Sequence, residues 1–301
     1  MIPLLSSSGS RHALWRIIRG LGLALALIAG LAGCSMVKLG YNNLPEVAYW
    51  WLDGYLDFSD AQAPRAREAL ARVQQWHRTQ ELPRYAQLLR EAEAQVGGEV
   101  TAAQVCSLAA QGRDRIEVLS QQTAPALAAL AQDMTDEQLE HLAKRQARSN
   151  EKFRKEWVSP SLAERREQRV RRLVERFETA YGRLEEPQRA VLRQKVELST
   201  YDPQRALAER VARQADLRQV MRQIRSLPAA SDEARLLAAG LMQRMLDSPD
   251  EAHRRRQEAW LSENCALIAA VHNATTPTQR EHASRRLRGW QRDFTELGAA
   301  R

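Results

Sequence analysis

Residues 161–181 read SLAERREQRVRRLVERFETAY, and this stretch decides the fold class. Its apolar side chains recur every three or four residues, at Val170, Leu173, Val174, Phe177 and Tyr181. That spacing places them on one face of an α-helix, with arginines and glutamates on the others. Ser161 and Glu164 have the spacing of a capping box, in which two side chains accept hydrogen bonds from exposed backbone amides. The stretch therefore predicts an amphipathic helix over 162–181.

The same helix-start signal recurs along the chain, at Ser59/Gln62, Thr101/Gln104, Thr135/Gln138, Ser161/Glu164, Ser248/Glu251 and Thr276/Gln279. Pro249 and Pro277 stand where a first helical residue loses nothing by lacking an N–H. The starts at 101, 135, 185 and 276 also share a Thr or Glu followed three residues later by Gln. Their irregular spacing favours repeated use of one cap over the decay of a duplicated unit.

Alternating runs rich in β-branched and aromatic residues, which are typical of strands, are absent from the sequence. The start signals and apolar stripes predict an all-α protein, an antiparallel helical bundle with short connections. The expected helices span 46–57, 61–81, 84–96, 102–131, 136–157, 162–181, 187–198, 203–226, 232–246, 250–273 and 278–297.

The N-terminal residues have the pattern of an export signal. Arg11, Arg16 and Arg19 precede LGLALALIAGLAG at 21–33, an apolar run shorter than the ~20 residues of a membrane-spanning helix. Leu31-Ala32-Gly33-Cys34 resembles a lipobox, which implies cleavage before Cys34 and acylation of that cysteine. An ordinary signal peptide and an uncleaved signal anchor are the alternatives.

We therefore divide the chain into a lipoprotein signal peptide (1–33), a lipidated N-terminus with a first aromatic-acidic helix (34–60) and an α-helical periplasmic domain (61–301). Ser35, rather than Asp, follows the cysteine and favours the outer membrane, facing the periplasm. The formal net charge of +8 would suit nucleic acid, but export leads us to expect no nucleic-acid partner.

Cys106 and Cys265 are the two remaining cysteines. An oxidising compartment favours a disulfide between them. Two separate buried thiols are the alternative.

Residues 41–60 read YNNLPEVAYWWLDGYLDFSD. Trp50, Trp51 and their tyrosine neighbours suit a bilayer interface, and Asp53, Asp57 and Asp60 recur at helical spacing, as for a cation site. We favour a plainer interpretation, a packed first helix with solvated carboxylates, because three aspartates oppose insertion at an anionic surface.

Residues 76–85 read WHRTQELPRY. Pro83 ends or kinks a helix at Leu82, so Trp76, His77, Arg78, Glu81 and Tyr85 gather around one bend. A histidine held by the carboxylate of Glu81 would make a base. A structural pair that fixes the corner is the interpretation we prefer.

Metal, nucleophile and nucleotide templates are missing from the sequence, so we predict no metal, no cofactor and no catalytic residue. The arginine-rich stretch 165–176 would contact lipid headgroups, or it is a solvated helix with ion pairs along its length.

The lipobox, the aromatic-acidic stretch 49–60 and the WHRTQELPRY bend together resemble a family of uncharacterised proteobacterial lipoproteins, a domain of unknown function. The resemblance covers most of the chain after Cys34. It implies lipidation of Cys34 and assigns no activity.

Three roles follow, in order of preference. The first is a non-enzymatic lipoprotein, anchored in the membrane, that binds another envelope protein or supports envelope assembly. The second is a membrane-tethered chaperone or foldase, which exposed apolar grooves would favour. The third is a peptidoglycan-acting enzyme, which requires a cleft that contains a buried glutamate such as Glu81.

Overall fold

The computed structural model describes residues 36–300 and divides the chain into two units, Met1–Leu44 and Pro45–Arg301. In the first, residues 36–42 are helical, and the side-chain amide of Asn43 donates to the carbonyl of Leu39 at 2.8 Å. The signal peptide, Cys34 and Ser35 lie outside the described residues.

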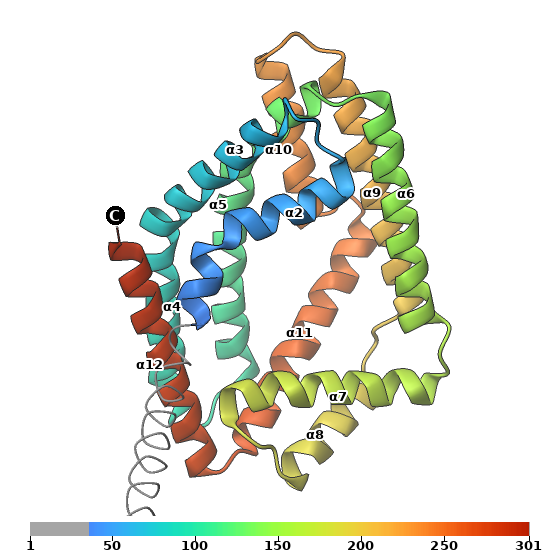
Figure 1. The fold of residues 1–301 in the computed structure, drawn as a ribbon. Coiled ribbons are helices and arrows are strands. Elements are labelled where there is room, and N and C mark those ends of the chain that lie inside the picture. The colour runs from blue at the N-terminus through green and yellow to red at the C-terminus, as the bar shows by residue number, and fades with distance from the viewer. Residues whose placement is uncertain (1–35, 301) are drawn as a thin grey trace, which may run out of the picture. The chain divides into compact units, whose positions relative to one another are not determined.

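The described residues form helices and turns, without a strand (Figure 1). The helices are α2 (Leu44–Leu56), α3 (Ala63–Trp76), α4 (Leu82–Val96), α5 (Ala102–Gln132), α6 (Asp136–Phe153), α7 (Leu162–Tyr181), α8 (Glu186–Glu197), α9 (Pro203–Arg225), α10 (Asp232–Leu246), α11 (Glu251–Asn273) and α12 (Pro277–Ala299). Two π-helical turns, η1 (His77–Glu81) and η2 (Arg154–Val158), follow α3 and α6. The predicted all-α helical bundle is confirmed.

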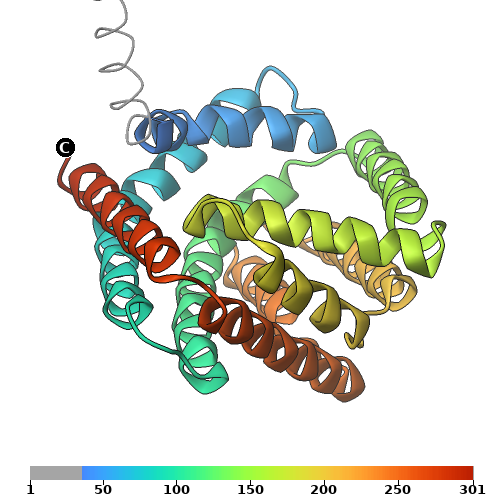
Figure 2. The ribbon, with the colours of Figure 1, turned by 90° about the horizontal axis from the view of Figure 1, so that it is seen from below.

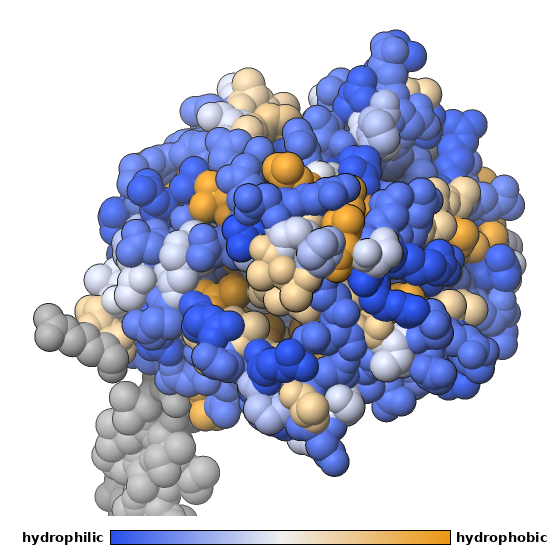
Figure 3. Space-filling view, turned by 90° about the horizontal axis from the view of Figure 1, so that it is seen from above, coloured by the Kyte–Doolittle hydropathy of each residue, from blue (hydrophilic) through white to orange (hydrophobic). Residues whose placement is uncertain are grey.

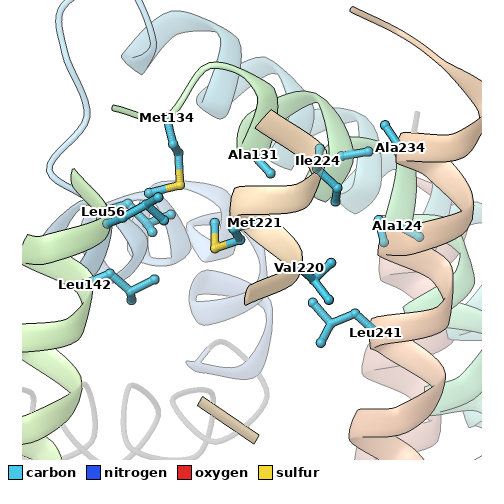
Figure 4. Close-up of a cluster of buried hydrophobic side chains, with 13 residues drawn as sticks. Leu56, Ala124, Ala131, Met134, Leu142, Val220, Met221, Ile224, Ala234 and Leu241 are labelled. Atoms are coloured by element: carbon cyan, nitrogen blue, oxygen red, sulfur yellow. The ribbon is translucent and has the colours of Figure 1, made fainter. Parts of the chain in front are cut away.

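Two apolar cores stabilise the second unit. The larger joins α2, the C-terminal half of α5, α6, α9 and α10. Figure 4 shows its packing, with Val220 of α9 beside Leu241 of α10. The smaller joins α7, α8 and α11 through Val174, Leu192 and Val271. Burial of such side chains contributes about 1.5–3 kcal/mol each, so these clusters hold the helices in place.

Two helix pairs pack closely side by side. α4 packs along α12 over most of its length, and α6 packs against α9 (Figures 1 and 2). Beyond the apolar core, the α6–α9 contact is polar: Arg210 donates to Asn150 at 2.9 Å and to Ser149 at 2.7 Å, and Asn150 donates to Gln214 at 2.7 Å. Such an interface fixes the register of the two helices, since each donor has a specific acceptor.

Two turns of the larger core are joined by a reciprocal pair of glutamines, which we call the first glutamine clasp. Gln62, at the start of α3, donates to the carbonyl of Asp133 at 2.7 Å. Gln138, at the start of α6, donates to the carbonyl of Asp57 at 2.7 Å, and the two amides also contact each other. Each acceptor lies five residues before the opposite glutamine. The clasp therefore satisfies two turn carbonyls through buried side chains.

The smaller core contains a second glutamine clasp with the same spacing. Gln188 donates to the carbonyl of Ala274 at 2.6 Å, and Gln279 donates to that of Arg183 at 2.8 Å. Histidines add to both junctions, each three residues after a clasp glutamine: His141 contacts the carbonyl of Gly54 at 3.3 Å, and His282 that of Ala180 at 2.8 Å. The first clasp thus joins the α2–α3 turn to the α5–α6 turn. The second clasp joins the α7–α8 turn to the α11–α12 turn in the same way.

These contacts explain why one helix-start signal recurs. The capping boxes at Thr101, Thr135, Ser161 and Thr276 are confirmed, and Glu185 caps α8 in the same way. The predicted start at Ser248 is wrong, because Asp250 caps α11 by accepting from the amides of Ala252 and His253. At Ser59 half of the box forms: its amide donates to Gln62, and α3 begins four residues later.

Candidate functional site

One face of α2, the helix that follows the lipobox most closely in the second unit, is apolar and strongly exposed. Trp50 and Trp51 are 62% and 63% exposed, and Val47 is 60% exposed. At 100° per residue these three positions lie within one sector of the helix. We call Val47, Trp50 and Trp51 the α2 aromatic face.

The opposite side of α2 fixes this face outward. Tyr49 and Leu56 are buried, and the Tyr49 ring stacks on Phe58 at a centroid distance of 5.8 Å. The guanidinium of Arg67 on α3 lies 3.6 Å from the centre of the Tyr49 ring and pairs with Glu46 at 3.2 Å. α2 is therefore packed on one side, as we predicted for this helix, but its tryptophans remain in contact with solvent.

The aspartates near this face have no common ligand geometry. Asp53 accepts from the backbone amide of Phe58 at 3.0 Å and so closes the C-terminal turn of α2. Asp57 and Asp60 follow the end of the helix. Within residues 36–300 no three His, Cys, Asp or Glu side chains are grouped to hold a metal ion.

The bend at 76–85 is a π-helical turn rather than a break. Proline has no N–H, and its ring would clash with the carbonyl of the preceding turn, so a regular α-helical turn cannot pass through Pro83. The chain forms η1 instead, and the amide of Leu82 donates to the carbonyl of His77. π-helical turns of this kind often occur at functional sites.

η1 turns Glu81 into the protein, where its side chain is 2% exposed. One carboxylate oxygen lies 3.8 Å from the guanidinium of Arg115 on α5. The other accepts no hydrogen bond from any donor among the described residues. Burial lowers the pKa of His77 below 6.5, although Glu81 opposes this shift, and burial raises the pKa of Tyr85.

The rest of the bend contacts the end of α12. Arg78 donates to the carbonyl of Leu297 at 3.2 Å, and the rings of His77 and Tyr85 lie 5.5 Å apart, with Phe294 beyond Tyr85. Trp76 ends α3, and Pro83 is the second residue of α4. A cleft of about 190 Å³ beside the bend is lined by residues of α4 and α5, Arg115 among them but not Glu81. This cleft therefore gives a ligand no direct contact with the carboxylate.

Cys106 and Cys265 form a disulfide between α5 and α11, with 5.4 Å between their Cα atoms. The arginines of 165–176 make ion pairs both within α7 and across to other segments: Arg171 with Glu167, Arg172 with Glu156 and Arg166 with Glu197. Three of the six arginines in this stretch are therefore paired with carboxylates.

The sequence did not reveal a cleft of about 350 Å³ between α9, α10 and α11, whose lining includes several charged residues. His253 lies 2.7 Å from Glu209, and Arg244 makes a two-pronged pair with Asp216 at 2.9 and 3.0 Å. The partners come from separate helices, so no local spacing announces them. All four side chains are used in contacts that join the helices, which favours a structural role.

A second exposed apolar surface lies where the α8–α9 connection crosses α11. Leu198 is 71% exposed and Trp260 is 43% exposed, and the Tyr201 ring lies 6.4 Å from the Trp260 ring. Glu263 fixes the connection by accepting from Ser199 at 2.9 Å. We call Leu198, Tyr201 and Trp260 the α11 patch. The face in Figure 3 is mainly hydrophilic, with hydrophobic residues in separate groups.

Comparison with known proteins places most of this structure in one family. A family model described as "Family of unknown function (DUF6279)" matches residues 54–238, from the end of α2 to α10. No curated protein and no solved structure matches the chain. Among the helices of residues 36–300, none is both long and apolar enough to cross a membrane.

Proposed function

The chain belongs to this family of unknown function, and we propose that it is a bacterial envelope lipoprotein, anchored through Cys34, whose helical body binds another envelope protein. The observation that carries the proposal is the sequence Leu31-Ala32-Gly33-Cys34 at the end of an apolar run, ahead of the folded helices. Each buried methylene of an acyl chain contributes about 0.8 kcal/mol, so two or three chains hold a protein firmly at a bilayer.

A binding role is supported by exposed apolar side chains on a rigid helical surface. The α11 patch presents two aromatic rings and a leucine, the kinds of side chain that fill pockets in protein interfaces. Glu263 holds the connection that carries Leu198 and Tyr201, so little ordering is needed on binding. Tethering raises the local concentration of the patch for any partner at the same membrane. Ser35 after the cysteine favours the outer membrane and the periplasm.

Replacement of the lipidated cysteine tests the anchoring. We expect the natural protein in the membrane fraction and Cys34→Ala in the soluble periplasmic fraction. Retention of Cys34→Ala in the membrane with its signal peptide attached would contradict the anchoring. A Ser35→Ala variant controls for mutation beside the cleavage point and is expected to remain anchored. Equal release of the natural protein and Cys34→Ala into the soluble fraction would contradict the proposal.

Site-specific photocrosslinking tests the binding role. A photoreactive residue at Leu198 is expected to capture one discrete partner in intact cells. The same residue at Leu236 of α10, which is as exposed but lies outside the patch, is the matched control. Absence of a discrete product at Leu198, or an identical product at Leu236, would count against binding through the patch.

A membrane-tethered chaperone is the second candidate, and exposed Leu198 and Trp260 of the α11 patch favour it too. The same experiment separates the two. A dedicated partner gives one crosslinked species, whereas unfolded clients give a broad distribution that grows when secretory load increases.

A further inference from the structure

The α2 aromatic face is exposed although the rest of α2 is packed. Trp50, Trp51 and Val47 are each at least 60% exposed, whereas Tyr49 on the opposite side is almost fully buried. An indole exposed to this extent leaves apolar area in water, and tryptophan is enriched where one edge of a ring is apolar and the other is wet. This face therefore suits a boundary between water and a less polar phase.

Charged side chains border the face without entering it. Glu46 lies at its edge and is neutralised by Arg67, whose guanidinium also lies 5.8 Å from the Trp50 ring. Asp53 is occupied as the acceptor that closes α2. Arg145 of α6, near Gly54 at the far end of the helix, adds a second cation there. The arginines at both borders offset part of the negative charge that the aspartates bring to this end of the chain.

The short distance in sequence between Cys34 and the α2 aromatic face favours the lipid bilayer as its contact. Val47 follows Cys34 by thirteen residues, which span at most about 45 Å even when fully extended. If Cys34 is acylated, the bilayer surface is always within that distance of the face. We propose that the α2 aromatic face lies in the interface of the phospholipid bilayer, so that the body has one preferred side toward the membrane. This inference rests on the proposed anchoring at Cys34.

Fluorescence quenching by brominated lipid tests the inference on the full lipidated chain. The protein is reconstituted in vesicles of phosphatidylethanolamine and phosphatidylglycerol in which part of the lipid is dibrominated in its acyl chains. Six tryptophans follow Cys34. We expect bromine to quench about a third of their emission, and the double variant Trp50→Phe/Trp51→Phe to lose that quenched component. Trp260→Phe on α11 is the matched control and is expected to retain it.

The outcomes separate this inference from the anchoring. A protein that floats with the vesicles but shows no quenched component at Trp50 and Trp51 would overturn the inference while the anchoring stands. If such a protein also dimerises through α2, the face belongs to a second copy, and the inference fails equally. A chain that does not float with the vesicles overturns both. Circular dichroism of the double variant, whose changes are at exposed positions, is expected to match the natural protein.

Discussion

Glu81 and Arg115 form an unequal pair, because the carboxylate is almost fully buried and the guanidinium is about one quarter exposed. Arg115→Ala leaves a buried charge without its counter-ion, and we expect it to lower the free energy of unfolding by about 3 kcal/mol. Glu81→Gln removes the buried charge, and its partner can be hydrated. We therefore expect a loss below about 1 kcal/mol, or a gain, in urea unfolding of the same protein.

The double variant Glu81→Gln/Arg115→Ala sharpens this test. We expect it to be more stable than Arg115→Ala alone, because the uncompensated charge is gone. Equal losses for the two single variants, or no recovery in the double variant, would show that the pair does not act through the buried charge.

His272 gives the protein a pH-dependent term. It is buried, its Nε2 donates to the carbonyl of Gly98 at 2.7 Å and its Nδ1 accepts from the hydroxyl of Tyr181 at 2.9 Å. The contact with Tyr181 requires the neutral ring, because a protonated Nδ1 cannot accept a hydrogen bond. Burial lowers the pKa of His272 below 6.5 and raises that of Tyr181 to about 12.

A histidine whose pKa is lower in the folded state contributes stability that is present above pH 6.5 and lost as the pH falls through the folded pKa. We expect His272→Gln to unfold at a temperature that changes less between pH 7 and pH 5 than that of the natural protein. His253→Gln, at a more exposed ion pair, is the control. If His272→Gln lost as much thermal stability between pH 7 and pH 5 as the natural protein does, His272 would not be the source of the acid sensitivity.

At the residue scale the sequence could predict which residues gather at the bend, but not what they do there. The spacing of His77 and Glu81 indicated a local pair. The structure directs Glu81 toward Arg115, thirty-four positions away in another helix. The π-helical turn depends on Pro83 and on close contact with α12. A Cβ atom at Gly298 of α12 would lie only 3.3 Å from the carbonyl oxygen of Arg78. Local periodicity carries no information about that contact.

At the element scale, the capping boxes differ in what their glutamines hold. Gln104 bonds only its own turn, at Thr101. Gln138 bonds its own turn and also the carbonyl of Asp57 and the amide of Gln62 across the core. We expect Gln104→Ala to cost about 1 kcal/mol of unfolding free energy. Gln138→Ala should cost about 2 kcal/mol more, since buried polar groups lose their partners.

Chemical denaturation of the two variants compares these costs directly. Gln188→Ala and Gln279→Ala, in the second clasp, are expected to resemble Gln138→Ala. If all four variants lost the same stability, the clasps would contribute nothing beyond helix capping.

Helix starts were the most predictable feature of the fold, because a cap is a local arrangement of a few residues. The failure at Ser248 has a local cause as well. Asp250, two residues on, offers a carboxylate to the first free amides of α11, and a carboxylate is the stronger acceptor there. The reason for the recurring glutamine could not be predicted from the sequence, because the carbonyls that these glutamines bind lie 71 to 96 positions away.

At the scale of the whole molecule, the disulfide between Cys106 and Cys265 closes a loop of 159 residues and ties α5 to α11. Closing so long a loop stabilises the folded state by about 5 kcal/mol in the chain-entropy model. We expect reduction to lower the unfolding temperature by about 10 °C. Scanning calorimetry with and without reductant measures this temperature. The double variant Cys106→Ser/Cys265→Ser should unfold at the lower temperature whether or not reductant is present. An unchanged unfolding temperature would contradict the assignment of this role.

The two cores illustrate what one sequence leaves open at this scale. Periodicity identified the apolar stripe of α7, but α8 and α11, which complete its core, lie in separate parts of the chain. Likewise the larger core takes α2 from one end and α10 from far along the chain. Pairing of distant helices depends on complementary shape across their faces, and an apolar stripe does not specify its partner.

We propose that acyl chains on Cys34 hold the helical body of this protein against a membrane. Mass spectrometry of the N-terminal peptide from the membrane-extracted protein tests it most directly. We expect a peptide that begins at Cys34 and has the added mass of acyl chains on its sulfur and amino group. A peptide that contains Gly33 joined to an unmodified Cys34 would contradict this proposal.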